Sequence, residues 1–248
     1  MLRSIEEILG YKIQAEDGTL GRIKDIYFDD TSWAIRYVVV DTGTWMAGRQ
    51  IVLAPEVLGE PDPNRREMPI TLARRRIEGS PPIVQEQGLT PRQQQLLAEY
   101  YDWSLPAAKR SVGSAAMGAG DGPKAARMLL QNQQSEQLDP HLKSLRGMIG
   151  YHIRARGVDV GHIEDVLVQT DSWLLRYLVI DARNLVPGKK MLVSPAWVRR
   201  VEWSGGVVDV DLTAGSLKDG PPFDASQIIS REYEKKLYDH YAGDRYWE

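Results

Sequence analysis

The sequence contains no cysteine. This absence excludes disulfide bonds, thiolate metal sites and cysteine nucleophiles, and it fits a protein kept in a reducing compartment. Long apolar runs are also lacking, because segments such as 37–40 and 178–180 are far shorter than the roughly 20 residues that cross a bilayer. The N-terminal segment has Glu6 and Glu7 where a secretory signal would need an apolar core. We therefore expect a soluble, cytoplasmic protein.

A strong charge of either sign is missing as well. The 31 basic and 34 acidic side chains leave a net charge of -3, so no overall field draws the chain to phosphate backbones or anionic lipid. The sequence has no glycine-rich phosphate loop, dinucleotide fingerprint or nucleophile elbow. Its histidines lack close ligand spacing and suit exposed polar positions, although His152 and His162 can approach each other across a hairpin. We predict that the protein is not an enzyme, with no catalytic residues, cofactor or metal ion.

What the chain does contain is a repeat. The stretch from Ser32 to Asp41 recurs from Ser172 to Asp181, with every position displaced by 140. The same offset aligns residues 4–55 with 144–195 without a gap, and it persists to Tyr101 and Tyr241. The repeating unit is therefore about a hundred residues long, which is an ordinary size for a domain.

Each copy has the sequence pattern of a small β domain. Short β-branched and aromatic runs alternate with turn signals about every 8–12 residues, and Asp17-Gly18 between two such runs is typical of a hairpin. Apolar residues on both faces of the run from Trp33 to Asp41 indicate a strand covered from both sides, with Trp33 and Tyr37 on one face as core anchors. The expected strands of the first copy cover 11–15, 20–28, 33–41, 49–53 and 67–72.

A short amphipathic helix follows each predicted β domain. Thr90 is the expected N-cap of the first helix, and the second spans 230–241. Residues 104–122 are rich in Ala, Gly and Ser, as in a linker, and 123–134 can form a helix. We therefore predict an all-β fold with short helices, built as two tandem small β-barrels. The boundaries are 1–103 for the first barrel and its helix, 104–140 for a partly helical linker, and 141–248 for the second barrel and its helix.

Residues present in both copies are interpreted first as folding residues. Gly10, Gly21 and Gly48, with their counterparts, are expected at turns or bulges. An arginine interrupts the apolar strand of each copy, and a charge near a core needs a partner. The alternative is an anion site or partner-facing site at this arginine. The predicted structural ion pairs involve Arg36, Asp25 and Asp41, and in the second copy Arg176, Asp165 and Asp181.

Together these residues resemble the PRC-barrel family. The resemblance rests on Gly10-Tyr11, the step Gly21-Arg22-Ile23-Lys24-Asp25, the strand from Trp33 to Asp41 and Leu53-Ala54-Pro55, with their counterparts in the second half. The tails, with Pro81-Pro82 before Tyr100-Tyr101 and Pro221-Pro222 before Tyr246-Trp247, are similar to bacterial proteins that carry this domain in tandem. The resemblance covers nearly all of the chain outside the linker.

The resemblance implies a role in assembly. PRC-barrels form the cytoplasmic domain of the photosynthetic reaction-centre H subunit and the C-terminal domain of ribosome-maturation factors. This sequence has no N-terminal transmembrane helix, unlike the first, and no separate N-terminal β-domain, unlike the second. Neither specific function carries over, because a fold alone does not determine function.

Two groups of side chains are candidates for contact with a partner. One is basic and can touch RNA phosphates, although a solvated face suits the overall charge better. The other is aromatic, and rings left outside the core would form an interaction patch. The basic group is Arg65, Arg66, Arg74, Arg75 and Arg76. The aromatic group is Trp45, Tyr100, Tyr101, Trp103, Tyr238, Tyr246 and Trp247.

The leading hypothesis is a non-catalytic protein–protein interaction or assembly module with an unidentified protein partner, and a homo-oligomer is left open. An RNA- or ribosome-associated maturation factor is the first alternative, although the charge balance makes a nucleic-acid partner less favoured. A peripheral component of a photosynthetic reaction-centre-type membrane complex is the second, associated through a protein and without a membrane span.

Overall fold

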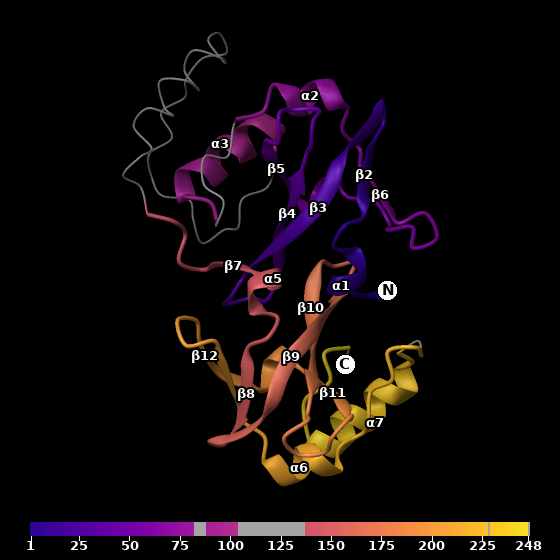
Figure 1. Ribbon diagram of the computed structural model, residues 1–248, viewed down its shortest axis with the longest axis vertical. Coiled ribbons are helices and arrows are strands. Elements are labelled where there is room, and N and C mark those ends of the chain that lie inside the picture. The colour runs from indigo at the N-terminus through magenta and orange to yellow at the C-terminus, as the bar shows by residue number, and fades with distance from the viewer. Residues whose placement is uncertain (82–87, 104–136, 228, 248) are drawn as a thin grey trace.

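The chain folds into two similar halves that pack against each other (Figure 1). The computed structural model describes residues 1–81, 88–103, 137–227 and 229–247. The regular structure is mostly β, in two mixed sheets, and the helices are short. This confirms the predicted β-rich class with short helices.

The elements of the first half follow the predicted order. Its strands are β1 (Leu2–Ser4), β2 (Lys12–Ala15), β3 (Gly18–Asp29), β4 (Ile35–Asp41), β5 (Gln50–Leu53) and β6 (Glu67–Pro69). Its helical segments are α1 (Ile5–Ile8), the 3-10 turn η1 (Pro55–Val57), α2 (Arg74–Glu78) and α3 (Pro91–Tyr101).

The second half repeats this order with one additional strand, β12. Its strands are β7 (Leu142–Ser144), β8 (His152–Ala155), β9 (Val158–Gln169), β10 (Leu174–Asp181), β11 (Lys190–Val193), β12 (Val198–Glu202) and β13 (Val207–Val210). Its helical segments are α5 (Leu145–Met148), η4 (Pro195–Trp197), α6 (Ala214–Asp219) and α7 (Arg231–Tyr241). Apart from β12, each of these has a counterpart about 140 positions earlier, as a structural repeat requires.

Local sequence signals account for several of these boundaries. Ala15 lies opposite Gly18 in the β2–β3 ladder, so the two residues between them form a tight hairpin turn. At the start of α3 the side chain of Thr90 accepts from the N–H of Gln93, and the side chain of Gln93 accepts from the N–H of Thr90. This capping box satisfies two N–H groups that the first helical turn leaves unpaired.

The central strand begins later than the sequence predicts. Trp33 has a φ of 57° and Trp173 a φ of 49°, so both lie in the left-handed region that ends a turn. The strands start beyond them, at Ile35 in β4 and at Leu174 in β10. The prediction that Trp33 shares a strand face with Tyr37 was therefore wrong.

Closed barrels are not what the described residues form. The ladders give one path β5-β4-β3-β2-β6 and another β11-β10-β9-β8-β13-β12, with parallel pairing between β2 and β6 and between β8 and β13. β5 and β6 are the edge strands of the first path. Beyond them, one isolated bridge joins Leu58, in the segment after β5, to Ile70, in the segment after β6. The two predicted barrels are thus seen as open mixed sheets.

Each half lends its first strand to the sheet of the other half. β1 pairs with β9, with Leu2 opposite Gln169, and β7 pairs with β3, with Leu142 opposite Asp29. These two pairings are equivalent under the offset of 140. The short helices α1 and α5 follow their strands across the junction, as their places beside β9 and β3 show (Figure 1). The two halves are therefore connected by a reciprocal exchange.

The exchange explains why β3 and its counterpart β9 both contain an aspartate at the same position. The hydroxyl of Ser144, the N-cap of α5, donates to Oδ2 of Asp25 at 2.6 Å, and the N–H of Arg146 donates to its Oδ1 at 3.2 Å. In the other half the hydroxyl of Ser4 and the N–H of Glu6 donate to Asp165 in the same way. Each carboxylate thus caps a helix that belongs to the other half of the sequence.

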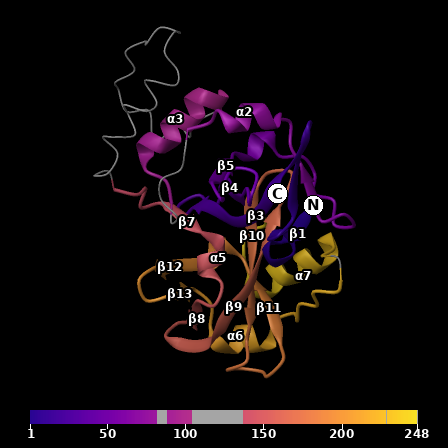
Figure 2. The same ribbon diagram turned by 45° about the horizontal axis from the view of Figure 1, so that its top comes forward.

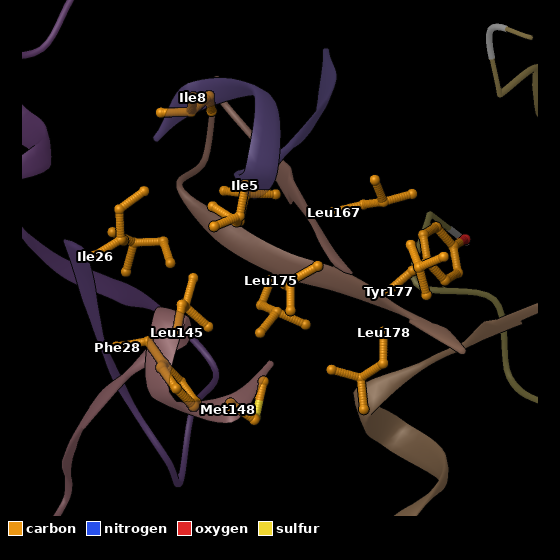
Figure 3. Packing of buried hydrophobic residues seen from close by; sticks show 14 of the residues in the cluster. Ile5, Ile8, Ile26, Phe28, Leu145, Met148, Leu167, Leu175, Tyr177 and Leu178 are labelled. Atoms are coloured by element: carbon orange, nitrogen blue, oxygen red, sulfur yellow. The ribbon is translucent and has the colours of Figure 1, made fainter. Parts of the chain in front are cut away.

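One hydrophobic core runs through both halves. Ile5 of α1 is fully buried and points toward Leu167 and Leu175 of the second half, while Met148 of α5 lies beside Phe28 of the first (Figure 3). Fully burying an isoleucine contributes about 1.5–3 kcal/mol, so the exchanged helices stabilise the junction. The halves are not independent units joined only by a linker.

A second cluster lies between the first sheet and α3. Tyr37, Val39 and Val52 project from the sheet toward Leu97 and Tyr101 of the helix. Ile35, Val38 and Val40 of β4 belong to the main core, so this strand is covered on both faces, as predicted. Figure 2 shows α3 over β4 and β5, with α7 at the corresponding end of the second half.

The shared glycines have the predicted structural roles. A Cβ atom on Gly21 would lie 2.0 Å from the carbonyl oxygen of Asp41, and one on Gly161 would lie 1.9 Å from that of Asp181. The backbone of β4 or β10 comes too close for any side chain there. Gly10, Gly48 and their counterparts have φ values from 76° to 90° and sit at turns.

The predicted linker falls mostly outside the described residues, and so does its expected helix at 123–134. The boundaries at 103 and 140 therefore stay predictions. Among the helices that the structure describes, none has the length and apolar character needed to cross a bilayer.

Candidate functional site

Arg36 and Arg176 mark equivalent β-bulges in the two halves. The register of the β3–β4 ladder shifts at Arg36, and that of the β9–β10 ladder shifts at Arg176. Nη2 of Arg36 lies 3.6 Å from Oδ2 of Asp29, while Nε of Arg176 donates at 2.6 Å to Oε1 of Gln169, the counterpart of Asp29. Each arginine thus contacts the neighbouring strand at the same position.

The aspartates predicted to pair with these arginines lie elsewhere. Asp25 is opposite Val39, three residues beyond Arg36, and it caps α5 instead. Asp41 accepts from the N–H of Gly43 at 2.8 Å. A strand rises about 3.3 Å per residue, so these carboxylates lie too far along the ladder to reach the bulge.

The second half deviates from the prediction in the same way. Asp165 caps α1, and Asp181 accepts from Nε of Arg183 at 3.0 Å. The prediction of structural ion pairs was therefore wrong in its partners for both arginines.

The aromatic side chains after α7 are seated on the second half. Tyr238 is buried, and its ring centroid lies 5.1 Å from that of Trp247 and 6.2 Å from that of Tyr246. The guanidinium carbon of Arg176 lies 4.0 Å from the ring centroid of Tyr246, and that of Arg231 lies 4.4 Å from the centroid of Trp247. Residues 242–247, which we call the C-terminal tail, therefore cover their own half through ring and cation–π contacts.

The aromatic side chains of the first half also contact their own chain. Tyr101 is buried and stacks on Trp103 with a centroid distance of 4.3 Å, and the hydroxyl of Tyr100 donates to the carbonyl oxygen of Arg76 at 2.7 Å. The ring of Trp45 lies 4.4 Å from the guanidinium carbon of Arg74. The predicted aromatic group is thus mainly a set of packing residues, of which Trp103 is only half-buried.

The predicted basic group has internal contacts at four of its five positions. Beyond the contacts of Arg74 and Arg76 just described, Arg65 lies 3.8 Å from Asp62, and Arg66 lies 5.6 Å from the ring centroid of Tyr11. Arg75 is exposed on α2. The structure therefore places these arginines on a turn and on a helix, where most of them support local packing.

The two histidines that were expected to approach each other do so. His152 lies opposite His162 in the β8–β9 ladder, with His152 bonded to Asp159 at 3.1 Å and His162 to Arg183 at 3.1 Å. Within the part of the chain that the structure describes, no group of three or more His, Asp or Glu side chains is arranged to hold a metal ion.

A cavity of about 590 Å³ opens at the junction between the halves, beside the Arg36 bulge. We call it the junction cavity. Its wall comes from β4, from the segment after β5, from α3 and from the turn that connects β9 to β10. The principal wall residues are Arg36, Tyr37, Glu56, Glu60, Ala98, Trp103, Asp171 and Trp173.

The repeat shows what this cavity lacks. In the second half Arg176 and Tyr238 both contact the ring of Tyr246. Their counterparts under the offset of 140 are Arg36 and Ala98, and both line the junction cavity. The first half thus keeps the arginine of this arrangement but replaces a tyrosine with an alanine. Of the counterparts of the C-terminal tail, only Asp102 and Trp103 are among the described residues.

The halves also differ in which segment supplies a tryptophan ring, but each half has one in this region. A Cβ atom on Gly243 would lie 2.6 Å from Nε1 of Trp197, so the ring of Trp197 requires a glycine there. The corresponding positions of the first half hold Val57 and Trp103, so a ring enters the same region from the end of α3. We therefore attribute the space that remains in the first half to Ala98, and to the absence from its sequence of rings equivalent to Tyr246 and Trp247.

The cavity wall has more carboxylates than cations. Glu60 accepts from the hydroxyl of Thr170 at 3.2 Å, and Asp171 lies 3.3 Å from the ammonium group of Met1. Burial raises the pKa of Tyr37, so its hydroxyl remains protonated at neutral pH. The cavity therefore offers aromatic rings, a guanidinium group and carboxylates for recognition of a ligand.

Sequence reasoning missed this site because it looked for residues that the copies share. Ala98 attracts no notice alone, and its meaning comes from its difference from Tyr238. A comparison of the two copies position by position contains that signal. The contribution of Asp171 and Trp173 from the other half depends on the junction, which the sequence did not reveal.

The chain matches no protein-family model, and no curated protein matches it either.

Proposed function

We propose that the chain is a non-catalytic binding and assembly module whose junction cavity receives a segment of a partner protein. One observation carries the proposal: the first half is hollow where the second half seats its own C-terminal tail. Arg36 and Ala98 line the hollow, and their counterparts Arg176 and Tyr238 hold Tyr246. A partially aromatic, preformed concavity of this volume is typical of binding sites.

The same proposal includes the fold family. We interpret the two halves as PRC-barrel-like units, on the residues named above and on the short connection through η4 between β11 and β12, the strands at the two ends of the second sheet's path. The exchanged strands fix the two halves relative to each other through paired backbone and a shared core. This suits a scaffold that presents one binding site in a fixed orientation.

The proposal is tested by filling the cavity. Ala98→Tyr restores the side chain that the second half has, and we expect it to prevent partner proteins from binding. Ala196→Trp is the matched control, because Ala196 is exposed on η4 in the other half. Both full-length variants and the unmodified protein are immobilised, and proteins retained from native lysate are compared.

Loss of a specific protein with Ala98→Tyr, and its retention with Ala196→Trp, would support the proposal. The same proteins retained by all three would contradict it. A melting curve for each variant shows that any loss occurs in a folded protein.

An RNA-associated role has less support, because most of the arginine group contacts the chain itself. It is tested by RNA retention at low and moderate salt. Retention that vanishes with salt and weakens on neutralisation of Arg74, Arg75 and Arg76 would favour it over the protein-binding role.

A further inference from the structure

The partner segment can be described from the second half, where an equivalent site is occupied. This inference rests on the proposed binding function and specifies its ligand. In the second half the occupant is the C-terminal tail, in which Arg245 precedes Tyr246 and Trp247. Nη2 of Arg245 is bonded to the carboxylate of Asp239 on α7, and the two rings lie on Tyr238 and Arg231. The occupant is thus a basic residue followed by aromatic rings.

The first half keeps the charged groups of this arrangement. Asp239 has Glu99 as its counterpart, an exposed acidic residue one position beyond Ala98 on α3. Arg176, which lies on the ring of Tyr246, has Arg36 as its counterpart in the cavity wall. The first half therefore also has an acid that can pair with a basic residue and a guanidinium group that can lie on a ring.

The cavity wall adds further negative charge. Glu56, Glu60 and Asp171 line it together with Arg36, which is itself paired with Asp29. A cationic side chain is favoured near such an excess of carboxylates, and an acidic one is disfavoured. Trp103 and Trp173 also line the cavity, so an aromatic side chain bound there would lie among other rings.

Some residues around Tyr246 in the second half differ from their counterparts in the first half, and these differences indicate where a ring can bind. Arg231 and Glu234, which contact Tyr246, correspond to Pro91 and Gln94, and the amide of Gln94 donates to Asp139 at 2.8 Å. The side of the site near the start of α3 is therefore occupied. Ala98 is buried but lines the cavity, so the space for the ring lies on this side.

The chain itself does not offer this ring. After Trp103 the sequence contains no Phe, Tyr or Trp before Tyr151. The C-terminal tail of a second copy is held on its own half, where the hydroxyl of Tyr246 donates to Glu234 at 2.7 Å. A different protein is the remaining source.

We infer that the junction cavity binds an extended segment of another protein in which an arginine or lysine directly precedes one or two aromatic residues. The basic residue pairs with Glu99, and the first ring enters beside Ala98 and Arg36. The affinity then depends on a ring, on a cation and on their order in the segment.

A labelled peptide with the sequence of residues 242–248 is the probe, and its binding to the full-length protein is measured by fluorescence anisotropy. We expect saturable binding that weakens about tenfold with Ala98→Tyr and several-fold with Glu99→Gln. Glu78→Gln on α2 is the matched control for charge and should leave binding unchanged. Peptides in which the tyrosine is replaced with alanine, or the arginine with glutamate, should bind about tenfold more weakly.

The outcomes separate this inference from the proposed function. Binding that is lost with Arg231→Ala but not with Ala98→Tyr would show exchange with the C-terminal tail, and it would overturn the inference while leaving the proposed function intact. Absence of peptide binding, with a lysate partner still lost by Ala98→Tyr, would do the same. If neither the peptide nor a lysate partner depends on Ala98, both the inference and the proposed function are wrong.

Discussion

The hydroxyl of Ser144 donates to the carboxylate of Asp25 at 2.6 Å, although 119 positions of sequence separate the two residues. The same bond joins Ser4 to Asp165 in the opposite direction. These two contacts hold the exchanged helices, so they are the first place to test how the two halves depend on each other.

Replacing Asp25 with alanine should destabilise the whole chain. The substitution removes the acceptor for the Ser144 hydroxyl and for the N–H of Arg146, which costs about 1–3 kcal/mol in the free energy of unfolding. Urea unfolding measures the change. Asp211→Ala is the control, because the pair between Asp211 and Arg156 is exposed and should contribute less than about 1 kcal/mol. Equal losses for the two variants would contradict the capping role of Asp25.

The buried aspartates should also produce a pH dependence of stability. Burial raises the pKa of Asp25 and of Asp165 above the ordinary value of 3.8, against the opposing effect of their hydrogen bonds. A raised pKa means that the folded protein retains protons that the unfolded chain has released. The resulting stabilisation is complete below the ordinary pKa and is lost as pH rises through the raised one.

The double variant Asp25→Asn, Asp165→Asn isolates this effect. The free energy of unfolding of the unmodified protein, minus that of the variant, should fall as the pH rises from about 4 toward 7. Urea unfolding at a series of pH values measures it. A difference that increases with pH would mean that the folded state lowers these pKa values instead.

Gly21→Ala should be much more costly than an equivalent change at Gly43. The added Cβ would meet the carbonyl oxygen of Asp41 at 2.0 Å, so the backbone must move, at about 3 kcal/mol. Gly43 has a φ of 55° but open space around its Cβ position, and alanine there should cost only about 1 kcal/mol. Thermal or urea unfolding of both variants checks the order, and similar losses would refute the close approach of β3 to β4.

Arg36→Ala should have a smaller effect on stability than Arg176→Ala. Arg36 has an ion pair at 3.6 Å and a side chain that is 27% exposed, a pair that contributes about 0–1 kcal/mol. Arg176 loses both its bond to Gln169 and its contact with the ring of Tyr246, about 1–2 kcal/mol together. In a chain of this size the two Tm values should then differ by a few degrees. A larger loss for Arg36→Ala would give this arginine the structural role and weaken its assignment to binding.

Ala98→Tyr should be tolerated, since the junction cavity can accept a ring. We expect the free energy of unfolding to stay within about 1 kcal/mol of the unmodified value or to rise. Ala182→Tyr is the control, because Ala182 is completely buried and the added ring should cost more than about 3 kcal/mol. Strong destabilisation by Ala98→Tyr would show that the hollow is too small for a side chain.

The repeat made much of the fold predictable. The strands, the capped helix from Pro91, the glycine positions and the coverage of β4 on both faces all follow from local pattern and from the constant offset. These features depend on residues near one another in sequence. Turn chemistry and periodicity describe such residues well.

The exchange could not be predicted for a physical reason. The segments 2–8 and 142–148 are alternatives for the same two pairing positions, the ends of β3 and β9 that β2 and β8 leave unpaired. Both segments have the serine cap and the apolar positions that either place requires. Pairing within a half and pairing between halves therefore satisfy the same sequence pattern. The error in assigning Asp25 to Arg36 follows from this, because its actual partner lies in the other half.

The site was less predictable than the fold. Trp103 and Arg36 were both named from the sequence, but Trp103 for an aromatic patch and Arg36 for ion pairs with Asp25 and Asp41, whereas its ion pair is with Asp29. What brings them together is the junction, along with an alanine that breaks the repeat. The proposed site thus depends on a difference between the copies, whereas the sequence analysis compared only the residues that they share.

The exchanged strands also set an order of events during synthesis. β1 is synthesised long before its partner β9, which is not complete until residue 169 has been added. The first sheet likewise lacks β7 until residue 144 has emerged. Because these contacts are so distant in sequence, β1 and α1 stay unpaired while the intervening residues are added, and Ile5 and Ile8 are exposed to water and to chaperones during that time.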